Sequence, residues 1–228
     1  MVKAPTTPSR GTLCIMLKKL ITLILLISQL SFSQSEKEDY EMYSLILSER
    51  LELGKSAEKD KFLLIEQFMD EFDGTYHVFN HENDTITKSD LSLLYSMTYK
   101  DTTFLKRLTK EKDLRNVVVK LTSDTSEHPK INAELLRKPK IGIETITDKK
   151  YNGYFKKFRL INRGWNGIKR KYGTDKVLEF SQVNYCGQFA STYYAIHCGG
   201  LCGAGNIVIF EKVTGKWKIV TEINLWMA

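Results

Sequence analysis

The sequence has no apolar run long enough to cross a bilayer. Its longest run extends from Leu20 to Leu30, whereas a membrane-spanning helix needs about 20 residues. The basic pair Lys18–Lys19 precedes the run, and the small residues Ser31 and Ser33 follow it, directly before Gln34. This layout is typical of a cleaved secretory signal peptide. We therefore expect an exported protein, periplasmic or extracellular, with no stable transmembrane segment after cleavage.

Residues 1–33 are thus the expected signal peptide, and residues 1–15 are an extension that such a signal does not need. Met16 is a natural start for the signal. Residues 34–228 are long enough for a single α+β domain. The net charge of the whole chain is +7, but the leader carries four basic residues and no acidic ones. The expected mature chain has a net charge of only +3, which argues against nucleic acid as a partner.

Cysteine is scarce, which makes the pair in the glycine-rich segment 197–205 informative. Cys198 and Cys202 both lie in this segment. In an oxidising compartment, such a pair favours a disulfide over a redox or metal centre. The bond would close a five-residue loop and stabilise it by about 2 kcal/mol. Cys186 is then the odd cysteine, either buried or paired between chains.

A zinc site from Cys186, His197, Cys198 and Cys202 has suitable ligand types. However, a strand of about eight residues separates Cys186 from the other three, which places them about 26 Å apart. The remaining three residues would lack a fourth ligand. We therefore predict no metal site.

Recognisable catalytic motifs are also missing. No serine lies in a Gly-x-Ser-x-Gly elbow. The glycines of 199–205 precede a strand rather than a helix, and a Walker-type lysine is absent, so they do not form a phosphate-binding loop. The four histidines, His77, His81, His128 and His197, are expected to be structural or solvent-exposed. No catalytic residue and no cofactor is predicted.

Hydrophobic periodicity predicts helices followed by strands. Residues 37–53 have the pattern of an amphipathic helix, and a second apolar stripe at helical spacing covers 155–172, with a break near 162–164. From Val177 onward the period changes to two. Strands are expected at 177–185, 189–198, 205–213 and 216–226. Earlier in the chain, shorter patterns indicate strands at 117–119 and 141–145, and either a strand or a helix at 62–65. The short turns predict an α+β fold with N-terminal helices on a C-terminal four-stranded antiparallel meander.

Several C-terminal motifs occur in a characteristic order. They are Trp165, 171–173, 180–183, 190–194, the 198–205 turn, Gly-Lys-Trp-Lys at 215–218 and Trp226. In this order they resemble an uncharacterised family of exported Bacteroidota proteins, over about residues 140–228. The resemblance implies a lineage and a compartment but no activity. The order of elements is also similar to that of the NTF2-like cone fold, as a loose analogy.

Two surfaces are candidates for binding. The basic run from Lys149 to Lys171 fits the solvated face of an amphipathic helix, or a contact with anionic cell-surface polymer or membrane. Aromatic residues on the predicted strands either pack in the core or line a binding surface; they are Tyr185, Tyr193, Tyr194, Trp217 and Trp226.

We therefore expect a non-catalytic binding or envelope-associated domain whose partner is an envelope polymer or another exported protein. A hydrolase-type enzyme acting on envelope material and a self-associating structural domain are the alternatives.

Overall fold

The computed structural model describes most of the chain after residue 36. The expected signal peptide, Cys14 and the histidines at 77, 81 and 128 lie outside the described residues. No helix in the described part is long and apolar enough to span a membrane. The chain forms two compact units, 1–39 and 40–228, of which the second is described below. The described ranges are 37–51, 61–68, 86–121, 130–137, 142–156, 161–200 and 202–228.

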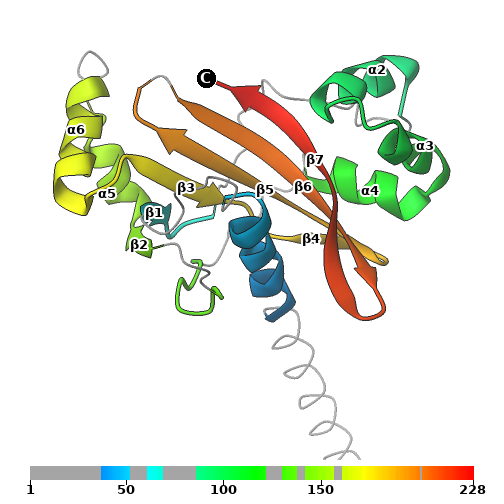
Figure 1. The fold of residues 1–228 in the computed structure, drawn as a ribbon, viewed down its shortest axis with the longest axis horizontal. Coiled ribbons are helices and arrows are strands. Elements are labelled where there is room, and N and C mark those ends of the chain that lie inside the picture. The colour runs from blue at the N-terminus through cyan, green and yellow to red at the C-terminus, as the bar shows by residue number, and fades with distance from the viewer. Residues whose placement is uncertain are drawn as a thin grey trace, which may run out of the picture. The chain divides into compact units, whose positions relative to one another are not determined.

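A mixed seven-stranded sheet forms the centre of the second unit (Figure 1). Its strand order is β2-β1-β3-β5-β6-β7, and β4 pairs with β5 next to β3. Strands β1 and β2 run parallel to each other and β1 runs parallel to β3, while the other pairs are antiparallel. The strands are β1 (Lys61–Ile65), β2 (Gly142–Ile146), β3 (Lys176–Phe180), β4 (Asn184–Cys186), β5 (Phe189–Cys198), β6 (Gly203–Val213) and β7 (Lys216–Met227).

The α+β class is confirmed, but the prediction of a four-stranded antiparallel meander is wrong. Two short strands, β1 and β2, extend the sheet by parallel pairing beyond β3. Parallel partners are joined by long connections, so no short turn in the sequence marks them as neighbours. The strand expected at 177–185 is interrupted at 181–183 and continues as β4 along the same edge of β5.

Helices occupy much of the rest of the described chain. Residues 37–49 are helical, as expected for this segment. The prediction of a strand at 117–119 is wrong, because these residues lie in α4. Leu114, Val117 and Val118 are fully buried and recur at helical spacing, and this periodicity outweighs the β-propensity of valine. The labelled helices are α2 (Lys88–Met97), α3 (Thr102–Lys110), α4 (Lys112–Leu121), α5 (Asp148–Gly153) and α6 (Ile161–Tyr172).

The break expected near 162–164 within the apolar stripe at 155–172 is wrong. Helix α5 ends at Gly153, whereas residues 162–164 lie inside α6. Gly164 does not end the helix. Its lack of a side chain lets the Phe155 ring approach the helix backbone, since a Cβ there would lie 2.6 Å from that ring. The glycine therefore serves the packing of α6 on the segment after α5.

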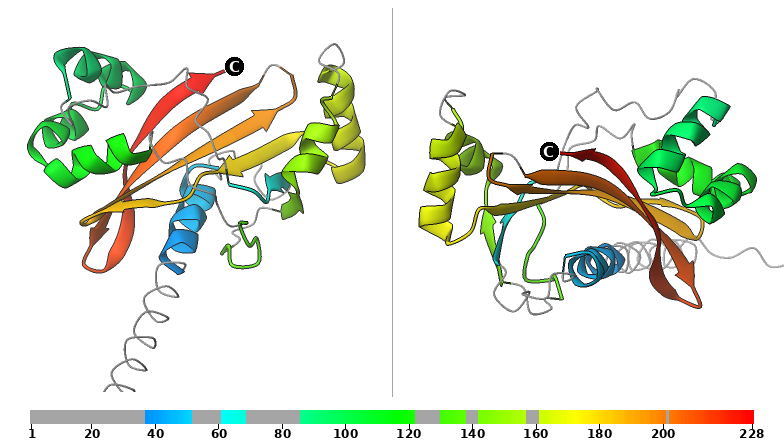
Figure 2. Two further views of the ribbon diagram at one scale, coloured as in Figure 1. Left: turned by 180° about the vertical axis from the view of Figure 1, so that it is seen from behind. Right: turned by 45° about the horizontal axis from the view of Figure 1, so that its top comes forward.

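The two faces of the sheet are covered differently (Figure 2). On the first face, the helical segment that follows Asp39 packs against Leu64, Phe180 and Tyr194. On the second face, α2–α4 cover one end, and Ile168 and Tyr172 of α6 pack on β1 and β3 at the other. Among the described residues, the sheet thus has one helical segment on its first face and two separate helical groups on its second.

Arg107 connects α3 to the β6–β7 end of the sheet through a set of hydrogen bonds, called the clamp below. Its guanidinium donates to both oxygens of Glu211 at 2.9 and 3.0 Å and to both oxygens of Glu111 at 2.7 and 3.0 Å. It also lies 5.5 Å from the centre of the Phe189 ring. The two carboxylates raise the pKa of Arg107 further above its usual range. This clamp fixes the helical group α2–α4 to the strands beneath it.

We expect the substitution Arg107→Met to lower the free energy of unfolding by about 2 kcal/mol, because it leaves two partly buried carboxylates without a cation. Methionine preserves helix propensity, so the change isolates the clamp. Urea denaturation measures the effect. The matched control is Lys106→Met at the exposed neighbouring position, which should change stability by less than about 0.5 kcal/mol. Equal effects of the two variants would contradict a stabilising clamp.

Candidate functional site

The cysteine-bearing turn joins β5 to β6 and is closed by a disulfide between Cys198 and Cys202. Their Cα atoms are 4.9 Å apart. The Cys198 amide donates to the Cys202 carbonyl at 2.9 Å. Gly199 has φ +71°, in the left-handed region that glycine adopts without strain. The expected pairing of these two cysteines is confirmed, and it fixes a hairpin that the glycines alone would leave adaptable.

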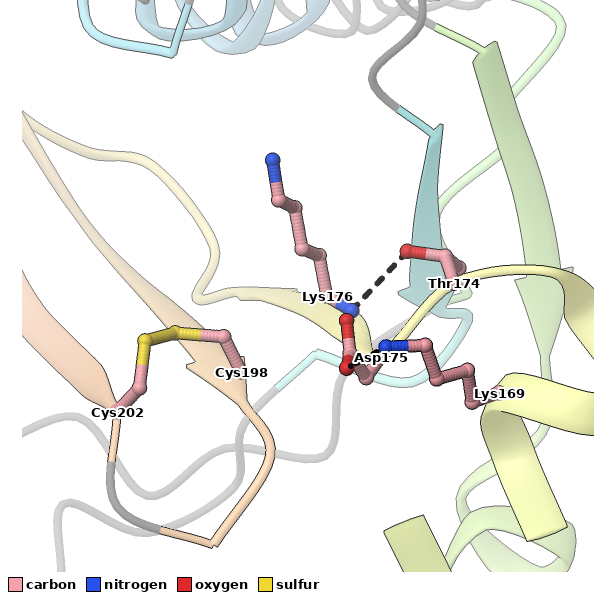
Figure 3. Close-up of a disulfide and its surroundings, with 6 residues drawn as sticks. All are labelled: Lys169, Thr174, Asp175, Lys176, Cys198 and Cys202. Carbon is pink, nitrogen blue, oxygen red and sulfur yellow. Dashed lines mark hydrogen bonds and ion pairs between the residues drawn. A yellow bond between two sulfur atoms is a disulfide. The ribbon is translucent and has the colours of Figure 1, made fainter. Parts of the chain in front are cut away.

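This turn packs against the corner between α6 and β3 (Figure 3). The Gly199 amide donates to the Asp175 carbonyl at 3.3 Å. The Asp175 carboxylate accepts a 2.9 Å hydrogen bond from Lys169 of α6, which lowers the pKa of that carboxyl. A Cβ on Gly200 would lie 3.1 Å from Oδ1 of Asn162 at the start of α6. The disulfide therefore holds the turn beside the most basic part of the chain.

The surface of α5 and α6, here called the α5–α6 surface (described residues 148–156 and 161–176), carries an unusual density of exposed cations. Four of them form no ion pair with any other described residue; they are Lys149, Lys156, Arg163 and Arg170. Two others, Lys150 and Lys171, place their ammonium groups 5.6 and 5.3 Å from the centre of the same Tyr172 ring. A single aromatic ring therefore holds two like charges near each other, where mutual repulsion is unfavourable.

Charge is strongly segregated along the sequence. Residues 148–176 contain ten basic residues and two acidic ones, a net charge of +8. The rest of 34–228 contains 20 basic and 25 acidic residues, a net charge of −5. A segment of this kind creates a positive field of its own, although residues 34–228 together have a net charge of only +3.

The five aromatic residues proposed as a binding surface do not lie together. Tyr194 and Trp217 are buried in the core of the first face, with Tyr185 packed against Trp217 at a ring distance of 5.8 Å. Tyr193 is buried on the second face, where Trp226 remains partly exposed. The Tyr193 hydroxyl accepts a 3.0 Å hydrogen bond from the Trp226 indole. Tyr185 and Trp226, the two partly exposed members, thus lie on opposite faces.

The residues considered as zinc ligands are also separated. Cys186 pairs with Phe189 at the start of β5, whereas His197 and Cys198 end that strand. The Cys186 thiol is not disulfide-bonded and lies 3.8 Å from Oδ1 of Asp113. His197 instead lies 3.4 Å from Oε2 of Glu179. Sequence reasoning missed Glu179, although its alternation with Leu178 and Phe180 in β3 could have placed it on the second face.

A shallow hollow of about 280 Å³ lies between α3 and the β6–β7 hairpin. Arg107 and Glu211 line it, together with Phe104 and Lys218. Because the guanidinium is already saturated by two carboxylates, this hollow has no unpaired arginine to offer a ligand. The α5–α6 surface, with four cations that pair with no other described residue, is the stronger candidate for binding.

No family model, curated protein or solved structure matches the chain. The resemblance to exported Bacteroidota proteins therefore stays a prediction, and a function must be argued from the residues and their geometry.

We expect the Cys198→Ser/Cys202→Ser double variant to lower the free energy of unfolding by about 2 kcal/mol, because the five-residue loop is no longer closed in the unfolded chain. Urea denaturation with and without reductant measures this. Reductant should destabilise the wild type by a similar amount and leave the double variant unchanged. The control Cys186→Ser should keep its sensitivity to reductant. A wild-type unfolding curve that ignores reductant would contradict a stabilising disulfide.

Proposed function

We propose that this protein is an exported, non-catalytic binding domain that holds an anionic polymer of the cell envelope on its α5–α6 surface. The observation that carries this proposal is the segregation of charge, +8 in residues 148–176 against −5 in the rest of residues 34–228. Folding alone gives no reason to concentrate cations in this way, since like charges on one helical group repel. An extended polyanion would relieve that repulsion.

The geometry of the described cations supports an extended partner rather than a small anion. Lys149 belongs to α5, Lys156 follows that helix, and Arg163 and Arg170 are seven residues apart on α6. Residues seven apart lie two turns apart on the same side of a helix. The charges are therefore spread over two elements and do not converge on a single point.

A hydrolase-type enzyme acting on the same envelope material is the second candidate, and one observation favours it. His197, the only histidine in the described part of the chain, is paired with Glu179, and their side chains keep 28% and 16% of their surface exposed. A histidine next to a carboxylate can serve in general acid–base catalysis. Release of reducing ends from a polysaccharide by the purified protein would show this activity, and loss of that release in His197→Ala would assign it.

The test of binding is a charge reversal. We expect replacement of Lys149, Lys156, Arg163 and Arg170 by glutamate to weaken binding of both polygalacturonate and polyphosphate at least tenfold, a change of about 1.4 kcal/mol or more. Titration calorimetry at low salt measures the affinity. Binding by the wild type should also weaken as salt rises, because salt screens exposed charges.

The control reverses four exposed lysines outside this surface and changes the net charge equally. They are Lys100, Lys106, Lys216 and Lys218. This variant should retain the wild-type affinity within about threefold, since only the overall charge has changed. Equal losses in the two variants would overturn the proposal, as would wild-type protein that binds neither polymer.

A further inference from the structure

Between its two helical groups, the second face of the sheet contains a row of residues whose two middle members are small and buried. Strand pairing aligns Glu179 with Ala195, Ala195 with Gly205, and Gly205 with Trp226. Four adjacent strands thus contribute one residue each, over about 14 Å. The two middle residues are small and the two outer ones are large, so the outer side chains have room to lean over the middle of the row.

The indole of Trp226 uses this room. A Cβ on Gly205 would overlap Nε1 of the indole and the Tyr193 hydroxyl, and a Cβ on Gly203 would lie 3.0 Å from the indole Cζ3. The indole therefore lies directly on the backbone of β6. Its hydrogen bond to the buried Tyr193 fixes its orientation. The His197 ring lies beside it, with centroids 5.5 Å apart and planes tilted by 33°.

At the other end of the row, the Glu179 carboxylate connects this platform to the α5–α6 surface. Glu179 lies 3.4 Å from His197. It also lies near Tyr151 of α5, whose pKa is raised by burial and by the Glu179 charge. Tyr151 in turn packs against Phe155 and Trp165, with ring distances of 5.2 and 6.4 Å. The row therefore ends beside α5, the first helix of the α5–α6 surface.

We infer that the row from Glu179 to Trp226 binds a sugar ring, so that the anionic polymer on the α5–α6 surface is an acidic polysaccharide. This inference rests on the proposed function. An indole held flat offers an apolar face to the C–H groups of a pyranose ring. The partly exposed carboxylate of Glu179, next to the His197 ring, can accept hydrogen bonds from hydroxyl groups. A simple cation would also suit an aromatic ring and a carboxylate, but the neighbouring +8 segment repels it.

Three probes separate the sugar from the charge. Polygalacturonate has both, its methyl-esterified form has the ring without most of the charge, and polyphosphate has the charge without the ring. We expect Trp226→Ala to weaken binding of polygalacturonate and of the methyl ester at least fivefold and to leave polyphosphate binding unchanged. Trp226→Phe should restore most of the affinity, and Glu179→Gln should weaken binding of the methyl ester.

Two controls guard against a general loss of structure. Tyr185→Ala removes a partly exposed aromatic ring from the opposite face and should change none of the three affinities. The fluorescence of wild-type protein should change with the methyl ester, and this change should be absent in Trp226→Phe. Polyphosphate binding by Trp226→Ala shows that the variant is folded.

The results distinguish the inference from the proposed function. If the four-cation reversal weakens all charged probes while Trp226→Ala changes nothing, the inference is overturned and the proposed function stands. If Trp226→Ala weakens binding of the methyl ester while the charge reversal has no effect, the sugar site stands and the proposed role of the α5–α6 surface fails. Equal weakening of polyphosphate and sugar by Trp226→Ala would also overturn the inference.

Discussion

Strand β5 is the element on which the rest of the described fold depends. It pairs with β3, β4 and β6, and its first seven residues are buried. A strand covered on both faces loses the usual alternation of polar and apolar residues. Two buried polar side chains of β5 each donate a hydrogen bond. The Ser191 hydroxyl donates to the Val117 carbonyl of α4, and the Thr192 hydroxyl donates to the Ser181 carbonyl. These bonds position α4 on one side of β5 and the β3–β4 interruption at its edge.

The burial of β5 changes along its length. Towards its end the burial falls, as Ile196, His197 and Cys198 are only partly covered. Helices α2–α4 cover the first half of β5 on the second face, while α6 packs near Val177 of β3, which pairs with His197 close to the end of β5. The sheet surface between these helical groups is where small residues, a partly exposed tryptophan and a histidine–glutamate pair occur together.

The sequence predicts local features well where a short-range cause exists. Strand β5 has the predicted bounds, because Gly187 in the preceding turn and Gly199 after it both need positive φ values that favour glycine. The disulfide follows from spacing and compartment. Long-range pairing has no such signal: nothing near Phe62 indicates that β1 lies between β2 and β3. The strand predicted at 117–119 is wrong for the same reason, because the burial of Val117 and Val118 against distant strands favours a helix there.

The same distinction between local and long-range causes applies to the candidate site. The basic residues are visible in sequence, since charge is a property of composition. The sheet row is not, because Glu179 and Trp226 are 47 positions apart and meet only through the register of three strand pairs. Their combination also has an energetic logic. The helices carry like charges whose mutual repulsion a polyanion would offset, and the row beside them holds an indole packed closely on a glycine that has no room for a side chain. The concentration of like charge departs from what stability alone would favour, and such departures concentrate at functional sites. That they adjoin each other through Glu179 and Tyr151 is the strongest reason to treat them as one binding surface.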